Sequence, residues 1–232
     1  MKRAPQHGPP LVAVVDSGWN RRVHHGRVVH GRGFARNGDG AMTVNNDDAD
    51  RTGHGSSIAR VILAVAESAV ILPIRVFSTN LETDHDTLTA ALTWLTEYPP
   101  NVVNLSLSSS DLLRAERTVR QCLRLQERGT FVVAALANEG VLSLPAEFDG
   151  VIAVAAQGNV ASTRADVSVP TTIIRSVLER HRLPLPPSNS YATAVCSAAL
   201  ANAISNDRTR AQAAPLTAIA HELERLNEYP GR

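Results

Sequence analysis

Short apolar runs alternate with helix-like patterns along most of the chain. Continuous apolar runs predict strands buried on both faces at 11–15, 69–77, 102–107, 131–137 and 151–156. Apolar positions at helical spacing predict helices at 58–66, 86–98, 111–128, 171–182 and 216–226. Strands and helices that alternate at this spacing favour an α/β fold with three layers, a mainly parallel β-sheet flanked by helices.

The stretch Ser-Asn-Ser-Tyr-Ala-Thr-Ala at 188–194 follows a proline-rich run at 183–187 and opens a long segment of small apolar residues. Proline lacks an N–H and constrains the residue before it, so the run cannot be helical. The segment after it reads as a buried, alanine-rich helix. Taken alone, Ser188 or Ser190 is best interpreted as an N-cap. The same position also suits a nucleophile, because unpaired N–H groups and the positive end of the helix dipole meet there.

Several segments show weaker patterns. Residues 19–50 are polar and glycine-rich, which predicts a loop with at most one short strand near Val28 and Val29. The acidic run at 45–50 could hold calcium, but it lacks the glycine and terminal glutamate of an EF-hand loop, so a solvated loop is preferred. Pro73 indicates an irregularity or an edge in its strand. We also expect a loop at 157–170 and a charged break at 206–210 before the last helix.

Composition narrows the class of protein. The chain has 232 residues, which suits one large domain, and 44% hydrophobic with 19% charged residues is ordinary for a globular protein. Aromatic residues make up only 4%, so the core must consist of Ala, Val, Leu and Ile, as in helices packed on a parallel sheet. The net charge of +1 gives no electrostatic reason to expect nucleic acid or an acidic membrane as a partner.

The ends of the chain and its apolar runs bear on localisation. Residues 1–10 carry positive charge but no apolar segment, so we predict an N-terminal tail and no signal peptide. No apolar run is long enough to span a membrane. We therefore expect a single domain at 11–232, soluble and cytoplasmic.

Cysteine and histidine give no case for a metal or another cofactor. Cys122 and Cys196 lie in apolar, helix-like surroundings without a partner at zinc spacing, so both are predicted to be buried free thiols. His24, His25 and His30 lack a carboxylate or cysteine at a convincing spacing. We predict no metal site and no cofactor.

Four residues fall where an α/β fold places chemistry. Asp16 and Asn138 each end a predicted strand, and His54 and Ser190 each enter a predicted helix. Nucleophilic acyl transfer needs a hydroxyl, a base, an orienting carboxylate and an oxyanion donor. Each part is present once: Ser190 as nucleophile, His54 as base, Asp16 as orienting group, and the Asn138 amide with the Ser190 N–H as oxyanion donors. The order Asp, His, Ser is also that of subtilisin.

The chain resembles the subtilisin-like serine proteases, and looks like a small intracellular member of that family. Six segments carry the resemblance in the family's order: the aspartate motif at 14–18, the histidine motif at 53–59, the substrate-binding strand at 103–108, the oxyanion-asparagine motif at 134–140, the following strand at 145–154, and the serine motif at 188–194. The resemblance implies a subtilisin-like fold and a serine-type endopeptidase in which Asp16, His54 and Ser190 form a catalytic triad.

This sequence also departs from the family's pattern. The serine motif lacks its leading glycine and final proline, and Ser57 stands where a second histidine is usual. Ser108 and Ala137 stand where the family usually has glycines beside the pocket for the residue before the cleaved bond. We expect these side chains to crowd that pocket. No calcium loop and no pro-domain are recognisable, which favours a specialised enzyme with selective substrates.

By the same resemblance, a substrate peptide would lie as a strand between two segments of the enzyme. The residues expected to bind it are Leu81, Glu82, Thr83, Leu105, Ser106, Leu107, Ser108, Ala135, Leu136, Ala137 and Glu139. Glu82, Asp84, Asp86 and Glu139 would gather near the cleft, which leads to the hypothesis that it prefers a basic residue near the cleaved bond.

The predicted function is therefore selective proteolysis, for example removal of a leader from a precursor peptide. The expected partners are a peptide or protein substrate and a separate partner or precursor peptide that supplies the pro-domain function. Two alternatives stay open. The same acyl-enzyme could be resolved by an amine, which would make the protein a peptide ligase or macrocyclase. The altered serine motif could instead mark a non-catalytic peptide-binding pseudoprotease.

Overall fold

The computed structural model describes residues 8–23, 25–79, 81–139, 141–159, 164–184 and 186–228. Strands and helices alternate along it. Its elements are β1 (Leu11–Asp16), β2 (Arg32–Arg36), β3 (Met42–Asn45), α1 (His54–Val65), β4 (Val70–Arg75), α2 (His85–Glu97), β5 (Val102–Leu105), α3 (Leu112–Glu127), β6 (Phe131–Ala135), β7 (Ile152–Ala156), β8 (Val167–Val169), α4 (Thr171–Arg180), α5 (Asn189–Ala213) and α6 (Pro215–Glu228).

The strands form one sheet in the order β3-β2-β4-β1-β5-β6-β7-β8. Neighbouring strands are parallel, except that β2 and β3 form an antiparallel pair at one edge. β1 lies near the centre, between β4 and β5, so the end of β1 is surrounded by other strand ends. In a sheet of this kind the carboxyl ends of the strands are where sites form.

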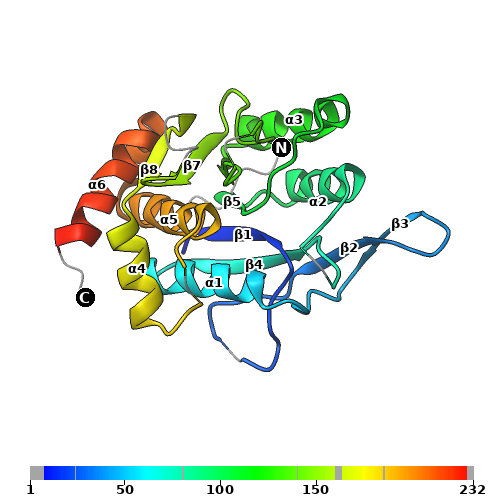
Figure 1. The fold of residues 1–232 in the computed structure, drawn as a ribbon, viewed down its shortest axis with the longest axis horizontal. Helices are drawn as coiled ribbons and strands as arrows, with labels where there is room; N and C mark the ends of the chain where they lie inside the picture. The colour runs from blue at the N-terminus through cyan, green and yellow to red at the C-terminus, as the bar shows by residue number, and fades with distance from the viewer. Residues whose placement is uncertain are drawn as a thin grey trace.

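Helices cover both faces of the sheet, as predicted (Figure 1). The side chains of β1 show the division: Val12 and Val14 belong to the core shared with α1, α4, α5 and α6, while Ala13 and Val15 belong to the core shared with α2 and α3. Because successive strand residues point to opposite faces, a continuous apolar run fills both cores. The predicted three-layer α/β fold is confirmed.

The alanine-rich helix α5 packs against β5, β6, β7 and β8 and against its neighbours α1 and α6, and most residues of its first turns are buried. Small side chains allow this close packing against the strands. The predicted charged break at 206–210 is present in the structure. It is a kink inside α5, where Asp207 leaves helical geometry (φ −154°, ψ 94°) and its carboxylate accepts a hydrogen bond from the Arg210 N–H at 3.0 Å.

Three strands were missed or misplaced by the sequence pattern. β2 and β3 form the hairpin that projects from the edge of the sheet in Figure 1, inside the predicted loop 19–50. Near Val28 there is only an isolated bridge to Ile71, not a strand. β8 lies inside the predicted loop 157–170. These strands are short and partly exposed, so they carry no continuous apolar run.

Pro73 lies in an interior strand, not at an edge. β4 pairs with β1 along its whole length, and with β2 only at Ile74 and Arg75. On the β2 side, Gly31 packs directly against the Pro73 carbonyl, where any side chain at position 31 would collide with it. The missing N–H of proline is tolerated because the pairing with β2 is interrupted there.

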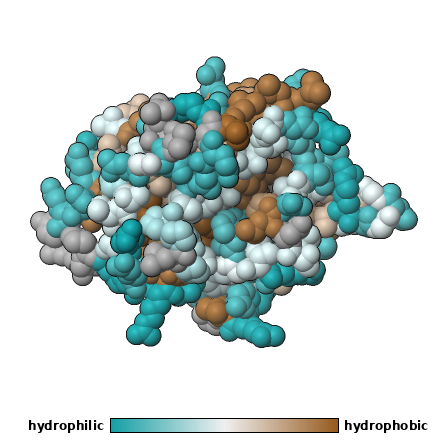
Figure 2. Space-filling view, viewed as in Figure 1, coloured by the Kyte–Doolittle hydropathy of each residue, from teal (hydrophilic) through white to brown (hydrophobic). Residues whose placement is uncertain are grey.

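The surface of the described residues is mostly polar and charged. Figure 2 shows apolar surface gathered over α3, whose first residues Leu112 and Leu113 are 62% and 95% exposed. Among the residues that the structure describes, no helix is long and apolar enough to cross a membrane.

Candidate active site

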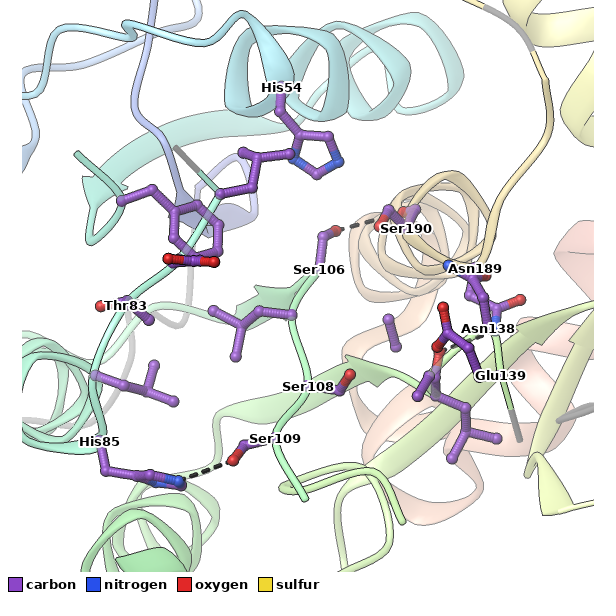
Figure 3. Close-up of a pocket in the computed structure, with 18 of the residues that line it drawn as sticks. His54, Thr83, His85, Ser106, Ser108, Ser109, Asn138, Glu139, Asn189 and Ser190 are labelled. Atoms are coloured by element: carbon purple, nitrogen blue, oxygen red, sulfur yellow. Dashed lines mark hydrogen bonds between the residues drawn. The ribbon is translucent and has the colours of Figure 1, made fainter. Parts of the chain in front are cut away.

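A cleft of about 400 Å³ opens at the carboxyl ends of the central strands. His54, Asn138 and Ser190 all line it, although they come from α1, the segment after β6 and α5 (Figure 3). These three residues are far apart in sequence, and they meet at the cleft because parallel strands end at the same edge of the sheet.

Asp16 and His54 form a direct pair. The His54 Nδ1 atom lies 2.8 Å from Asp16 Oδ1 and 2.9 Å from Asp16 Oδ2. Asp16 is fully buried at the end of β1, and its Oδ1 also accepts the Ser17 N–H at 2.7 Å. Since the carboxylate can only accept, the hydrogen of His54 resides on Nδ1, and Nε2 is left as an acceptor.

The start of α1 is shaped by two glycines. Gly53 is the N-cap and adopts φ 86°, a left-handed conformation that glycine tolerates and other residues rarely do. Gly55 passes so close to β1 that an added Cβ would lie 2.6 Å from the Gly18 carbonyl oxygen and 3.1 Å from the Ser17 nitrogen. The first turn of α1 therefore packs against the backbone that follows Asp16, which places His54 beside it.

Asp50 joins the segment around Asp16 to the helix that carries His54. One carboxylate oxygen accepts the Ser17 Oγ–H at 2.8 Å and the Gly53 N–H at 2.8 Å. The other accepts the Ser56 N–H at 2.9 Å and the Ser56 hydroxyl at 2.5 Å. Ser17 Oγ in turn accepts the Gly55 N–H at 2.8 Å. Asp50 thus caps α1, which has no capping side chain at Gly53, and supplies negative charge at its positive end.

Burial, hydrogen bonds and neighbouring charges shift the pKa values of His54 and Asp50. Burial lowers the pKa of His54, but the hydrogen bond and charge of Asp16, together with the charge of Asp50, outweigh it and raise the pKa above its ordinary value. Burial raises the pKa of Asp50, but hydrogen bonds from Ser56, Gly53 and Ser17 outweigh it and lower the pKa below the usual value. Asp50 is therefore an anion at neutral pH.

Ser190 lies in the first turn of α5. Ser188 is the N-cap, since its side chain accepts the Tyr191 N–H at 3.4 Å, which leaves Ser190 free of the capping role. Within the described residues, no hydrogen bond uses the Ser190 N–H, and none joins Ser190 Oγ to His54. The structure thus contains the Asp16–His54 pair without the contact between base and hydroxyl. In ligand-free enzymes such contacts are often long and tighten only when substrate binds.

A buried polar chain fixes α5 against β5. The Asn104 amide donates to Ser106 Oγ at 3.0 Å and accepts the Ser197 hydroxyl at 2.9 Å. Ser106 Oγ lies 3.4 Å from the Ser190 carbonyl oxygen (Figure 3). Because Asn104 and Ser197 are fully buried, these bonds replace solvation that both side chains lose on folding.

Asn138 is the third residue after β6 and is exposed in the cleft. Its side-chain oxygen accepts an N–H of the Asn159 amide at 3.4 Å, which turns the Asn138 NH₂ group away from Asn159. Gly140, the last residue of the predicted oxyanion motif, lies outside the described residues.

The walls of the cleft match most of the predicted substrate-binding residues. Leu81, Glu82 and Thr83 line one wall. The other predicted residues that line the cleft are Ser106, Leu107, Ser108, Ala135, Leu136, Ala137 and Glu139. Leu105 is an exception: it is fully buried in the core under α2 and α3 and does not line the cleft.

The predicted cluster of acidic residues is only partly present at the cleft. Glu82, Asp84 and Glu139 line it, but Asp86 lies in a separate groove, where it pairs with Arg36 at 2.5 Å and Arg117 at 2.9 Å. Asp84 caps α2 through the Thr87 N–H and also lies 3.4 Å from Arg36. The sequence indicated acidic residues near the cleft, but it could not show that Arg36 and Arg117 lie beside Asp84 and Asp86 and offset their charge.

Ser57, which stands where the family usually has a second histidine, has a neighbour in the serine motif. Ser57 is on α1 and Tyr191 is on α5, and the Tyr191 hydroxyl lies beside Ser57. Burial raises the pKa of Tyr191, an effect that this neighbour partly offsets. The Tyr191 and Ser57 side chains thus interact next to the turn that carries Ser190.

The acidic run at 45–50 binds groups of the protein itself. Asp48 pairs with Arg21 and accepts the Gly31 N–H, while Asp47 pairs with Arg51 and Arg75. Among the described residues, no group of three or more His, Cys, Asp and Glu side chains is placed to hold a metal ion. His24, one of the histidines considered for such a site, lies outside them.

Comparison with known proteins gives the family. The model of the subtilase family (Peptidase_S8) matches residues 9–219, which is most of the chain. The chain belongs to the subtilase family. Its enzyme class is that of a serine-type peptidase. No curated protein matches it in sequence.

Solved structures of subtilases share the fold. The epidermin leader peptide processing serine protease EpiP from Staphylococcus aureus is 18% identical with a TM-score of 0.72, over 94% of this chain and 69% of that one. A lanthipeptide protease is 19% identical with a TM-score of 0.67, over 88% and 76% of the two chains. A cold-adapted subtilisin-like serine proteinase is 17% identical with a TM-score of 0.63, over 85% and 76%. At these identities the likeness concerns the fold.

Proposed function

We propose that this subtilase is a serine endopeptidase that cleaves peptide bonds through an acyl-enzyme on Ser190. The observation that carries the proposal is the Asp16–His54 pair at 2.8 Å, held at the edge of a cleft that Ser190 also lines. A histidine fixed in one tautomer by a buried carboxylate, with its other nitrogen available, is what a general base for a hydroxyl nucleophile requires.

In this mechanism, His54 Nε2 removes the proton from Ser190 Oγ as the oxygen attacks the carbonyl carbon of the substrate. The tetrahedral intermediate collapses when the C–N bond breaks and His54 gives the proton to the leaving amine. An ester on Ser190 remains. Water, deprotonated by His54, then attacks the ester, and the proton returns to Ser190 as the acid product leaves.

Negative charge on the substrate oxygen would be bound by the Asn138 NH₂ group and the Ser190 N–H. Both donors lie at the cleft, and no hydrogen bond within the described residues uses the Ser190 N–H. Ser190 is in the first turn of α5, so the helix dipole adds to the stabilisation. Loss of one such donor in a related enzyme costs about 10²- to 10³-fold in rate.

We further propose that the substrate is a precursor peptide from which a leader is removed. The support is the structural likeness to an epidermin leader peptide processing serine protease and to a lanthipeptide protease, together with the side chains of Ser108 and Ala137 that line the cleft where the family usually has glycines. A peptide would pair as a strand with the segments at 81–83 and 106–108, which both line the cleft. Glu139, exposed in the cleft, together with Glu82 supports a preference for a basic residue near the cleaved bond.

The nucleophile can be tested without knowing the substrate. We expect an alkyl fluorophosphonate to label the wild type at Ser190, detected by intact mass and peptide mapping, because Ser190 Oγ displaces fluoride from phosphorus. Ser190→Ala should not be labelled while its circular dichroism and unfolding temperature stay unchanged. Ser205→Ala is a matched control on the same helix, far from the cleft, and should be labelled like the wild type.

A peptide library then tests the reaction. Hydrolysis gives two fragments whose combined mass exceeds the substrate by one water, whereas ligation or cyclisation gives no such gain. A wild type that is folded but not labelled would contradict the proposal and favour a peptide-binding protein. Equal cleavage of library peptides with and without Lys or Arg would remove the basic preference alone.

A further inference from the structure

The Asn189 side chain is inserted between two strands of the sheet, next to the proposed nucleophile. Asn189 is 1% exposed and is the first residue of α5. Its Oδ1 accepts the Ala156 N–H at 2.9 Å, and its Nδ2 donates to the Leu136 carbonyl at 2.8 Å. Ala156 ends β7 and Leu136 directly follows β6, so one amide group bridges the two strand ends.

This bridge stands where the sheet would otherwise make its own bond. β6 and β7 are parallel with Ala135 opposite Val154, and the Leu136 N–H donates to the Val154 carbonyl at 3.0 Å. In a parallel pair, a residue donates its N–H to one residue of the neighbouring strand, and its carbonyl accepts from the residue two positions further along that strand. Because Leu136 donates to Val154, its carbonyl would be expected to accept the Ala156 N–H. Those are the two groups that Asn189 occupies. The Asn189 amide therefore replaces one backbone hydrogen bond between β6 and β7 and bridges the two strand ends.

The bridge connects the two sources of the proposed oxyanion donors. Asn189 immediately precedes Ser190, and Leu136 lies two residues before Asn138, at the same wall of the cleft (Figure 3). The Asn189 backbone is itself held, because its carbonyl accepts the Thr193 hydroxyl at 2.7 Å. Ser190 and Asn138 are thus anchored to one rigid, buried side chain.

The carboxamide makes both bonds because its donor and its acceptor are on two separate atoms. An ionised aspartate offers acceptors only, and a threonine hydroxyl must donate and accept through one oxygen on a shorter side chain. Resting on the function proposed above, we propose that Asn189 is a positioning residue that sets the distance between Ser190 and the oxyanion donor Asn138. Asn189 acts through these two groups and does not itself bind the reacting atoms.

The test uses the fluorophosphonate, whose phosphoryl oxygen occupies the oxyanion position. Asn189→Asp keeps the shape and loses the donor to Leu136, and Asn189→Thr keeps a single polar oxygen. We expect both to label Ser190 roughly 10- to 100-fold more slowly per folded molecule, the range expected for misplaced catalytic groups. Thr130→Val is the matched control: Thr130 is buried and bonds the Pro100 carbonyl at 2.7 Å at the opposite end of β6. It should lose comparable stability and label at the wild-type rate.

Two further readouts separate positioning from a general loss of structure. The rate losses of Asn189→Thr and Asn138→Ala should not add in the double variant, because both act on the same oxyanion site. Amide hydrogen exchange at Ala156, measured by NMR, should quicken in Asn189→Thr, whose hydroxyl cannot take both places of the amide, and not in Thr130→Val.

Folded Asn189 variants that label at the wild-type rate would overturn this inference and leave the proposed function intact. A wild type that is not labelled would overturn both. If Asn189→Asp does not fold, because it places a charge in the core, Asn189→Thr alone decides the outcome. Additive losses in the double variant would also count against the positioning role.

Discussion

His54 Nδ1 lies within 2.9 Å of both carboxylate oxygens of Asp16. The carboxylate therefore holds the ring against rotation and favours its protonated form. Because the pKa of His54 is raised by Asp16 and Asp50, the active, neutral base should form only above its ordinary pKa of about 6.5.

The first prediction concerns pH. The rate of fluorophosphonate labelling should rise with pH along a single titration with a midpoint above about 6.5. The stability that the pair contributes runs the opposite way: it is fully present below the unfolded pKa and is lost as pH rises through the folded pKa. Labelling rates and unfolding temperatures measured from pH 5 to 9 would check both, and a midpoint below 6 would contradict the raised pKa.

The second prediction concerns Asp50. Asp50→Asn removes a negative charge near His54 and places an NH₂ group against amide donors at the start of α1. The pKa of His54 should fall, seen as a lower midpoint in the same labelling profile. The protein should lose about 1–3 kcal/mol of unfolding free energy, because buried donors are left unpaired.

Asp47→Asn is the control for this experiment. It removes the same charge from the same loop, but Asp47 pairs with Arg51 and Arg75, not with α1. Its pH midpoint should stay close to the wild type. Equal midpoints in all three proteins would show that Asp50 has no influence on His54.

The third prediction concerns the width of the cleft. Ser108 and Ala137 line it with side chains at positions where the family usually has glycines. Ser108→Gly and Ala137→Gly should extend cleavage in a peptide library towards bulkier residues before the cleaved bond. Ser110→Gly, on the same exposed loop but outside the cleft, should keep the wild-type preference. An identical preference in all variants would mean that these side chains do not limit the pocket.

The fourth prediction concerns the thiols. Burial raises the pKa of Cys122 to about 12 and raises that of Cys196 further. Neither should react with a disulfide reagent at neutral pH in the folded protein, and both should react after denaturation. Thiol reagents should therefore leave Ser190 labelling unchanged. Rapid reaction of the native protein would show that one of these cores opens readily.

The sequence was most informative where one physical requirement dominates. Strands buried on both faces need continuous apolar runs, so β1 and the other central strands were predicted within a residue or two. β2, β3 and β8 were not, because they lie towards the edges and are held by pairing with neighbours that local pattern does not reveal. The charged run at 206–210 indicated the break at Asp207, but local pattern could not show that the chain continues as a helix on both sides of it.

The sequence likewise indicated some residues of the site and missed others. Asp16, His54, Asn138 and Ser190 were singled out because strand ends and helix starts are recognisable from sequence, and all but the fully buried Asp16 line the cleft. The roles of Asp50 and Asn189 were missed, because their bonds reach backbone groups of segments that only the folded chain brings near. One signal for Asp50 was present: an acidic residue just ahead of a glycine-led helix start is a natural cap.

The order of the chain has a consequence for how the protein is made. Asp16 is on the central strand β1, which is synthesised first, and Ser190 is on α5, one of the last elements. β1 gains its neighbours β4 and β5 early, whereas the nucleophile reaches the cleft only after β6 and β7 have formed the ends that Asn189 joins. Until α5 has been synthesised and has docked on β6 and β7, the chain therefore lacks the complete set of proposed reacting groups.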